Sequence, residues 1–156
     1  MATSDNNKAA VTDTLLQEAW DEFRSFIKRR GDRVTETRRI VLNRALQRGG
    51  HFQADELAQD LSRGAVRVSR GTVYRTLALL VEAELVREIR DRDTHVHYEP
   101  VYNRPHHEHM ICESCGAFIE FDDAAIHSLI QKACDRMGFE QVSHRLVIFG
   151  VCKECQ

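Results

Sequence analysis

Residues 106–115 read HHEHMICESC, four metal-ligand side chains followed after two apolar residues by a C-x-x-C pair. A second C-x-x-C pair is separated from the first by 36 residues. Four thiolates at this spacing suit a closed tetrahedral zinc site, and two disulfides are the alternative in an oxidising compartment. We predict a structural Zn²⁺ site that fastens the C-terminal strand to the first hairpin of a small domain, and a redox role that expels the zinc stays open. The predicted zinc ligands are Cys112, Cys115, Cys152 and Cys155.

The histidines before the first cysteine pair lead into a predicted strand, where successive side chains point to opposite faces. His107 and His109 therefore face one way, and His106 and Glu108 face the other. Each pair is only half a metal site, so further ligands have to come from elsewhere in the chain; a solvated polar face is the alternative. The available partners are His51, His95, His97, Glu99, Glu120, His127 and His144.

The part of the chain before this stretch has helical periodicity and then two strand-like runs. The predicted helices cover 12–30, 36–48 (capped by Thr35), 54–61 and 71–83 (capped by Ser69), and the strands cover 85–90 and 95–98. Two short helices separated by a Gly-bearing connection, followed by a hairpin, indicate a winged helix-turn-helix.

The part after residue 105 is predicted to be a small α/β unit. Strands are expected over 109–112, 117–121 and 142–151, with a helix over 123–137. Cys134 lies on the apolar side of that helix, and we expect it to be buried rather than reactive. The fold class is thus α+β. The domains are a flexible arm (1–10), a winged-helix domain (11–99), a hinge linker (100–105) and a second domain (106–156).

Charge divides the chain in the same way as the domains. From Arg24 to Arg75 there are 13 basic and 5 acidic residues, a net charge of +8, although the whole chain carries −2. From Asp93 onward the net charge is −5, and that part holds 7 of the 8 histidines and all five cysteines. The basic half has the charge that DNA phosphates attract. No apolar run approaches the length of a membrane span, so we expect a soluble cytoplasmic protein without a membrane partner.

Three segments together resemble the ferric uptake regulator family of metal-dependent repressors. They are GTVYRTL at 71–77, HHEHMICESCG at 106–116 and GVCKEC at 150–155, and the resemblance spans about residues 12–155. It implies a winged-helix domain hinged to a dimerisation domain. The implied function is repression of metal-uptake genes with Fe²⁺ or Mn²⁺ as corepressor, by a homodimer or a dimer of dimers bound to double-stranded operator DNA.

The resemblance also implies two metal sites besides the structural zinc, a sensing site and a second site that is either regulatory or structural, and they separate as the strand alternation requires. The interdomain sensing site would consist of His51, Glu99, His107, His109 and Glu120. The second site, within the dimerisation domain, would consist of His106, Glu108, His127 and His144. Imidazoles with carboxylates suit Fe²⁺ or Mn²⁺, whereas selective zinc sensors recruit a thiolate.

Some positions depart from the patterns of individual branches of the family. Peroxide-sensing members have Asp where this chain has Glu99 and Glu120, and zinc-sensing members have Cys at Glu99. His127 stands where many members have Glu, so the second site has three histidines and could tolerate zinc. His95 and His97 share a strand face with Glu99, and are either incidental or extra ligands that favour nickel. Peroxide, nickel and zinc sensing remain the alternatives.

The resemblance and the helix positions together indicate the DNA contacts. The predicted recognition helix carries Arg70, Thr72, Tyr74 and Arg75 in its first two turns, where such helices present base-reading groups. Arg33 and Arg38 match basic positions of the family; a solvated helix face is the alternative.

A metalloenzyme is disfavoured, because the chain has no nucleophile elbow, Gly-rich phosphate loop or H-E-x-x-H helix. A metal-independent DNA binder is the remaining rival.

Overall fold

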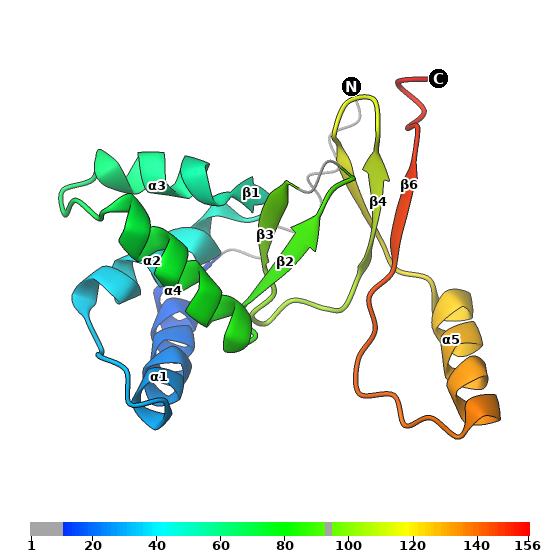
Figure 1. The fold of residues 1–156 in the computed structure, drawn as a ribbon, viewed down its shortest axis with the longest axis horizontal. Coiled ribbons are helices and arrows are strands. Elements are labelled where there is room, and N and C mark those ends of the chain that lie inside the picture. Colours follow the sequence, from blue (N-terminus) through cyan, green and yellow to red (C-terminus); the bar gives the residue numbers. More distant parts are fainter. Residues whose placement is uncertain (1–10, 93–94) are drawn as a thin grey trace. The chain divides into compact units, whose positions relative to one another are not determined.

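The computed structural model of the chain describes residues 11–92 and 95–156. These residues form two compact units, an N-terminal unit that ends at Arg104 and a C-terminal unit from Pro105 to Gln156. Figure 1 shows the order of the elements along the chain. The predicted arm, residues 1–10, and the hairpin tip, residues 93–94, lie outside the described residues. In the described part of the chain, no helix is long and apolar enough to cross a membrane.

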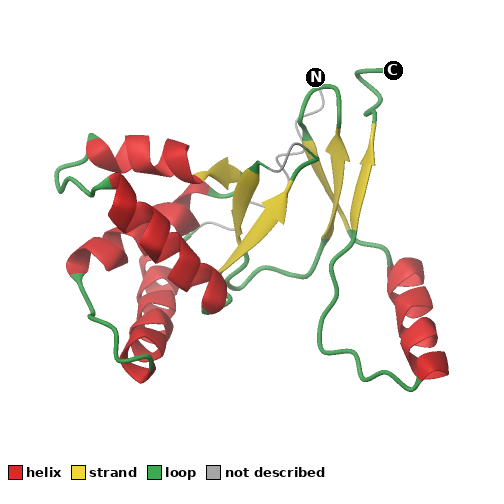
Figure 2. Cartoon of the chain, in the orientation of Figure 1, coloured by secondary structure: helices red, strands yellow, loops and turns green. Residues whose placement is uncertain are grey.

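Four helices make up most of the N-terminal unit (Figure 2). They are α1 (Asp13–Arg29), α2 (Glu36–Arg48), α3 (Ala54–Ser62) and α4 (Arg70–Glu82). Hydroxyl side chains cap three of them: Thr12, Thr35 and Ser69 each accept a hydrogen bond from the backbone N–H three residues later. Such caps satisfy donors that the first helical turn leaves without a partner. The bounds of each observed helix lie within about a residue of its predicted span.

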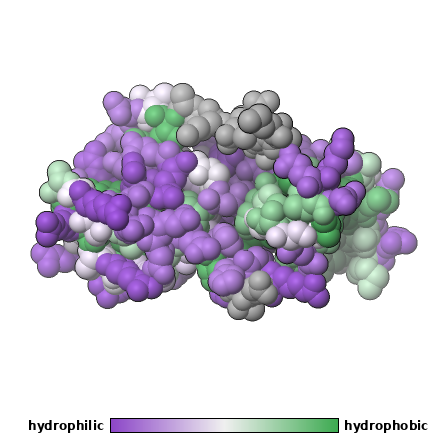
Figure 3. Space-filling view, turned by 90° about the horizontal axis from the view of Figure 1, so that it is seen from above, coloured by the Kyte–Doolittle hydropathy of each residue, from purple (hydrophilic) through white to green (hydrophobic). Residues whose placement is uncertain are grey.

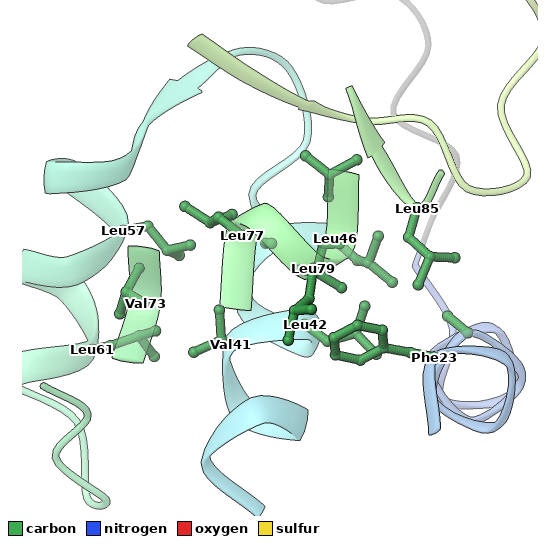
Figure 4. Close-up of a cluster of buried hydrophobic side chains, with 14 of the residues drawn as sticks. Phe23, Val41, Leu42, Leu46, Leu57, Leu61, Val73, Leu77, Leu79 and Leu85 are labelled. Carbon is green, nitrogen blue, oxygen red and sulfur yellow. The ribbon is translucent and has the colours of Figure 1, made fainter. Parts of the chain in front are cut away.

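The helices pack their apolar faces into one core (Figure 4). Phe23 of α1, Leu42 of α2, Leu57 of α3 and Leu77 of α4 are all fully buried. The connection of Ser62 to Ser69 lets α3 and α4 cross as a helix-turn-helix pair, with Val68 inserted in the core. This core fixes α4, while Arg70, Tyr74 and Arg75 of its first two turns stay exposed.

A three-stranded antiparallel sheet completes the N-terminal unit. Its strands are β1 (Phe52–Gln53), β2 (Val86–Arg90) and β3 (Val96–Pro100), in the order β1-β3-β2. The two-residue strand β1 was not predicted, since it is too short to have a periodic pattern. Pro100, predicted as the first residue of the linker, is instead the last residue of β3, where it lies opposite Val86.

The C-terminal unit contains a second three-stranded sheet and one helix. Strands β4 (Glu108–Cys112), β5 (Phe118–Phe121) and β6 (Val147–Gly150) lie in the order β5-β4-β6, with β4 antiparallel to β5 and parallel to β6. The strand predicted over 142–151 was too long, because only residues 147–150 pair with β4. Residues before Val147 form a connection from the helix to the sheet.

Helix α5 (Ala124–Met137) begins at Asp123, whose Oδ1 accepts hydrogen bonds from the N–H groups of Ala125 and Ile126. It ends at Gly138, whose φ of +62° is a left-handed conformation that favours glycine. No residue of this helix is buried, so the expectation of a buried Cys134 was wrong: that thiol is half-buried. The apolar periodicity was predicted correctly, but no described residue covers that side of the helix fully.

Candidate metal centres and nucleic-acid interface

The four cysteines of the C-x-x-C pairs meet at one end of the C-terminal sheet. Cys112 ends β4 and lies opposite Gly150 of the parallel neighbour β6, so the turns that follow the two strands emerge side by side. The sulfurs of Cys112, Cys115, Cys152 and Cys155 all lie within 4.8 Å of one another. All five cysteines of the chain are free thiols. The arrangement has the donors and the convergence of a tetrahedral zinc site, and it joins the last strand to the first hairpin as the sequence suggested.

The thiols of this cluster have opposite tendencies to ionise. Hydrogen bonds from the backbone N–H groups of Cys152 and Cys115 lower the pKa of Cys112 to about 6. Hydrogen bonds with the neighbouring thiols of Cys152 and Cys115 raise the pKa of Cys155 to about 12. Thiolates this close repel one another, so the last protons leave only when a cation offsets the accumulating negative charge. A divalent ion with soft-ligand preference fits this donor set.

A second cluster surrounds Glu108, whose side chain is buried. Its Oε1 lies 2.6 Å from His106 Nε2, 2.7 Å from His144 Nε2 and 3.9 Å from His127 Nε2. The backbone N–H of Leu146 donates to Oε2 at 2.8 Å. Burial alone would raise the pKa of Glu108, but the hydrogen bonds from His106 and Leu146 outweigh it and lower the pKa.

Two ring nitrogens of this cluster fit a metal ion better than a hydrogen-bond network. His127 Nε2 and His144 Nε2 are buried and make no hydrogen bond with the described residues. His144 Nε2 comes within 2.7 Å of the carboxylate oxygen, but its direction does not suit a hydrogen bond. Buried nitrogens aimed at a common point without hydrogen-bond partners are typical of ligands to one ion.

Two residues beside this cluster were missed by the sequence analysis. Asp122 Oδ1 lies 3.6 Å from His127 Nε2, and its place one residue after β5 was the available signal. Gln141 Nε2 lies 2.8 Å from His144 Nδ1, and no sequence pattern pointed to it. Gln141 lies where it can orient the His144 ring, whereas Asp122 lies beside the same His127 nitrogen that an ion would use.

Two of the predicted sensing residues lie in the N-terminal unit. His51 immediately precedes β1, Glu99 lies on β3, and the pairing of Phe52 with Tyr98 brings them together. His51 Nε2 lies 3.8 Å from Glu99 Oε2, and the Glu99 side chain is fully buried. Arg104 Nη1 donates to Glu99 Oε1 at 3.0 Å. This arginine was also missed, since it stands in the region predicted as a linker.

The other three predicted sensing residues lie in the C-terminal unit. His109 lies opposite Glu120 in the β4–β5 pairing, and the ring centroids of His107 and His109 are 5.0 Å apart. His107 Nε2 lies 4.0 Å from Glu120 Oε1. The other ring nitrogen, Nδ1, lies 3.0 Å from the carbonyl oxygen of Pro105, which can only accept. Nδ1 therefore carries the proton, and Nε2 keeps the lone pair that a metal requires.

His95 and His97 have a local partner in the wing. His95 Nδ1 and His97 Nε2 each lie 3.2 Å from Asp91 Oδ2, and the His95 N–H donates to Oδ1. Burial alone would raise the pKa of Asp91, but these hydrogen bonds outweigh it and lower the pKa. These contacts associate both histidines with the hairpin turn.

The predicted DNA contacts lie on α4 and around the start of α2. Arg70, Tyr74 and Arg75 belong to the first two turns of α4, while the Thr72 hydroxyl contacts the Ser69 cap at 2.9 Å. Arg38, in the first turn of α2, donates to the carbonyl oxygen of Arg33 at 2.6 Å. Arg70 and Tyr74 both contact Asp55, an α3 residue that the sequence analysis did not single out.

The exposed apolar side chains concentrate in the C-terminal unit. Of the eleven large apolar residues that are exposed among the described residues, nine belong to it. Figure 3 shows the hydrophobic surface gathered on that part of the molecule, and a mostly hydrophilic surface over the N-terminal unit. Ile119, Met110 and Ile148 lie opposite one another across the three strands, so they form a row on one face of the sheet. Exposed apolar patches of this kind mark protein interfaces.

Comparison with known proteins points to one family. The sequence pattern of the ferric uptake regulator family matches residues 29–149. The chain is 32% identical over 145 residues to the ferric uptake regulation protein of Campylobacter jejuni, covering 92% of this chain and 89% of that protein. It is 29% identical over 141 residues to the peroxide-responsive repressor of Staphylococcus aureus, covering 90% and 94% respectively. The solved structure of the Helicobacter pylori ferric uptake regulator, described as having three functional metal-binding sites, matches with a TM-score of 0.79 at 26% identity, over 90% of this chain and 93% of that one.

Proposed function

This chain belongs to the ferric uptake regulator family, whose members are metal-responsive transcriptional regulators, and we propose that it is a cytoplasmic repressor of metal-uptake genes with Fe²⁺ or Mn²⁺ as corepressor. Proteins of this family bind operator DNA as dimers and are not enzymes. The four-cysteine cluster, the histidine and carboxylate groups and the basic recognition helix supply the parts that such a regulator needs.

The observation that carries the choice of metal is the donor set proposed for sensing. It contains imidazoles and carboxylates and no thiolate: His51, Glu99, His107, His109 and Glu120. Glu99 is fully buried and His107 presents Nε2, so both are prepared for a cation. Bound Fe²⁺ or Mn²⁺ would supply a fixed set of coordination directions and positive charge. The four cysteines would hold Zn²⁺ structurally, and His106, Glu108, His127 and His144 would form a second site.

The route from metal to repression follows from the division of the ligands between the units. The two N-terminal and three C-terminal ligands, sharing one ion, would fix the angle between the units. A dimer with both angles fixed can present two recognition helices to successive major grooves about 34 Å apart. Metal and DNA would then tighten each other's binding by the same factor.

Peroxide sensing is the second candidate, favoured by the 29% identity to the Staphylococcus aureus repressor. The alternative that the family resemblance implies is a repressor that senses peroxide by metal-catalysed oxidation of a histidine. Intact-mass measurement after peroxide treatment distinguishes the two: a gain of one oxygen in the Fe²⁺-loaded but not the Mn²⁺-loaded protein favours peroxide sensing. An unchanged mass together with retained DNA binding favours metal sensing alone.

The test of the proposed function is metal-dependent DNA binding. Protein purified without oxygen is stripped with a strong chelator, its residual zinc is counted, and DNA binding is measured by fluorescence anisotropy with Fe²⁺, Mn²⁺, Ni²⁺ or Zn²⁺ restored. Replacing His107 and His109 with Ala should abolish the metal-dependent part, whereas His95→Ala in the wing should keep it. Equal DNA binding with and without chelator would instead favour the metal-independent DNA binder.

A further inference from the structure

Asp55, in the first turn of α3, holds two side chains of the recognition helix. Its Oδ1 lies 2.8 Å from Arg70 Nε, and its Oδ2 accepts from Arg70 Nη2 at 2.9 Å. The Tyr74 hydroxyl donates to Oδ1 at 2.7 Å. The Arg70 guanidinium also lies 5.5 Å from the centroid of the Tyr74 ring. A two-point ion pair and a phenol hydrogen bond therefore meet at this one carboxylate, and a cation–π contact joins its two partners.

The geometry of this contact is the geometry with which arginine binds nucleic acid. The planar guanidinium fork matches two acceptor atoms at once, whether they belong to a carboxylate, a phosphate or the O6 and N7 edge of guanine. Arg70 is thus already occupied by an internal acceptor where it would meet DNA. The Arg70 and Asp55 side chains are 70% and 56% exposed, so the pair is weak in water and exchangeable.

We propose that Asp55 is a specificity-determining residue, which occupies the Arg70 fork and the Tyr74 hydroxyl until a cognate base replaces it. The inference rests on the proposed DNA-binding function. On a non-cognate duplex, Arg70 can only exchange the Asp55 carboxylate for a phosphate, which is another anionic acceptor. Arg70 therefore adds little to the affinity for non-cognate DNA. On a cognate duplex, a base edge accepts the fork in the major groove, and the contact is specific. Asp55 thus weakens non-cognate binding more than cognate binding.

The test compares Asp55→Asn with a matched substitution on the same helix. Asp60→Asn removes the same charge from α3, but its carboxylate pairs with Arg44 and Arg48 of α2. Both variants and the wild type, loaded with zinc and Mn²⁺, are titrated with a mixed-sequence duplex of about three helical turns and with a duplex selected by the wild type from a random pool. The amide oxygen introduced by Asp55→Asn can still accept from the Tyr74 hydroxyl, so helix packing is disturbed little; circular dichroism checks the fold.

We expect Asp55→Asn to bind the mixed-sequence duplex roughly three- to tenfold more tightly and with a steeper salt dependence, because one more cation reaches phosphate. Affinity for the selected duplex should rise less, so the ratio of the two affinities falls. Adding Arg70→Gln should remove the gain, and this double-mutant cycle attributes it to the pair.

Two outcomes overturn the proposal. In the first, Asp55→Asn changes binding no more than Asp60→Asn does, so only net charge matters. In the second, Asp55→Asn weakens both duplexes, so that Asp55 merely supports α4. Failure of the DNA-binding function itself is distinguishable, because the wild type would then bind neither duplex when loaded with metal.

Discussion

At the scale of single residues, Arg104 stabilises the buried Glu99 carboxylate in the absence of a metal. Glu99 is fully buried, and a buried charge requires a partner of opposite sign. Arg104 Nη1, at 3.0 Å, supplies positive charge and a hydrogen bond to an oxygen that the proposed sensing ion also needs. The arginine therefore competes with the ion for Glu99 and should set how much metal is required for activation.

Arg104→Gln should have two effects of opposite sign. The chelator-treated protein should lose about 1–3 kcal/mol of stability, because Glu99 loses its charged partner. The affinity for Mn²⁺ should rise, because the ion no longer has to displace the Arg104 guanidinium from Glu99 and no longer experiences repulsion from its positive charge. Thermal unfolding of the chelator-treated protein measures the first effect, and Mn²⁺ titration in a His127→Ala background measures the second.

Arg104→Lys, which retains the charge, and Arg63→Gln, at an exposed loop position, are the controls for this pair of measurements. Both should stay near the wild type in Mn²⁺ affinity. Weaker rather than tighter Mn²⁺ binding by Arg104→Gln would mean that the arginine orients Glu99 for the ion instead of competing with it.

At the scale of elements, we expect β6 to depend on a metal held by the four-cysteine cluster for its place in the sheet. It pairs with β4 over only four residues, Val147 to Gly150, and three of those four residues are exposed. Removing zinc with a chelator strong enough to strip the four-cysteine cluster should raise the rate of amide hydrogen exchange in β6 and in the Cys112–Cys115 turn by about tenfold or more. The buried segments of α2 and α4 provide the internal reference, since the core cluster to which they belong contains no cysteine or histidine. Equal exchange increases in both units would contradict a local fastening role.

The cap of α4 is a second element on which function should depend. Ser69 Oγ accepts from the Thr72 N–H at 3.3 Å and contacts the Thr72 hydroxyl. Ser69→Ala should cost about 1 kcal/mol of stability and should also weaken DNA binding, because the first turn carries Arg70. Thr12→Ala removes the equivalent cap of α1 and should reduce stability similarly while leaving DNA affinity nearly unchanged. Equal losses of DNA affinity in both variants would show that stability alone is responsible.

How much of the structure could be predicted depended on whether the signal was local. Helix starts at Thr35 and Ser69 follow from short-range backbone geometry, and they agree with the structure. His106 lies beside Glu108 and His107 beside His109, as the alternation predicted, although β4 itself begins only at Glu108. The strand predicted from residue 142 failed because the extent of β6 is fixed by its distant partner β4. Asp55, Arg104 and Gln141 could not be found from the sequence, since their partners are brought close only by tertiary packing.

At the scale of the whole molecule, the exposed apolar row Ile119–Met110–Ile148 is the surface that we expect a partner to cover. These side chains are 36%, 38% and 39% exposed and lie opposite one another across the C-terminal sheet. Proteins of the family bind DNA as dimers, so we expect a second copy of this chain, whose own row has matching chemistry, to cover the row. Met110 is central in the row, so a charge there should be desolvated on association.

Met110→Glu should therefore convert the dimer to a monomer. Burying an unpaired carboxylate is costly, so we expect the dimer dissociation constant to rise by about 100-fold or more, measured by sedimentation equilibrium. DNA binding should fall in parallel, because one recognition helix alone cannot span two half-sites. The control is Val142→Glu, which introduces the same charge at a residue that is 94% exposed in the loop after α5. Zinc content must stay at the wild-type level in both variants; a Met110→Glu protein that retains zinc and remains dimeric would place the interface on another surface, such as the uncovered side of α5.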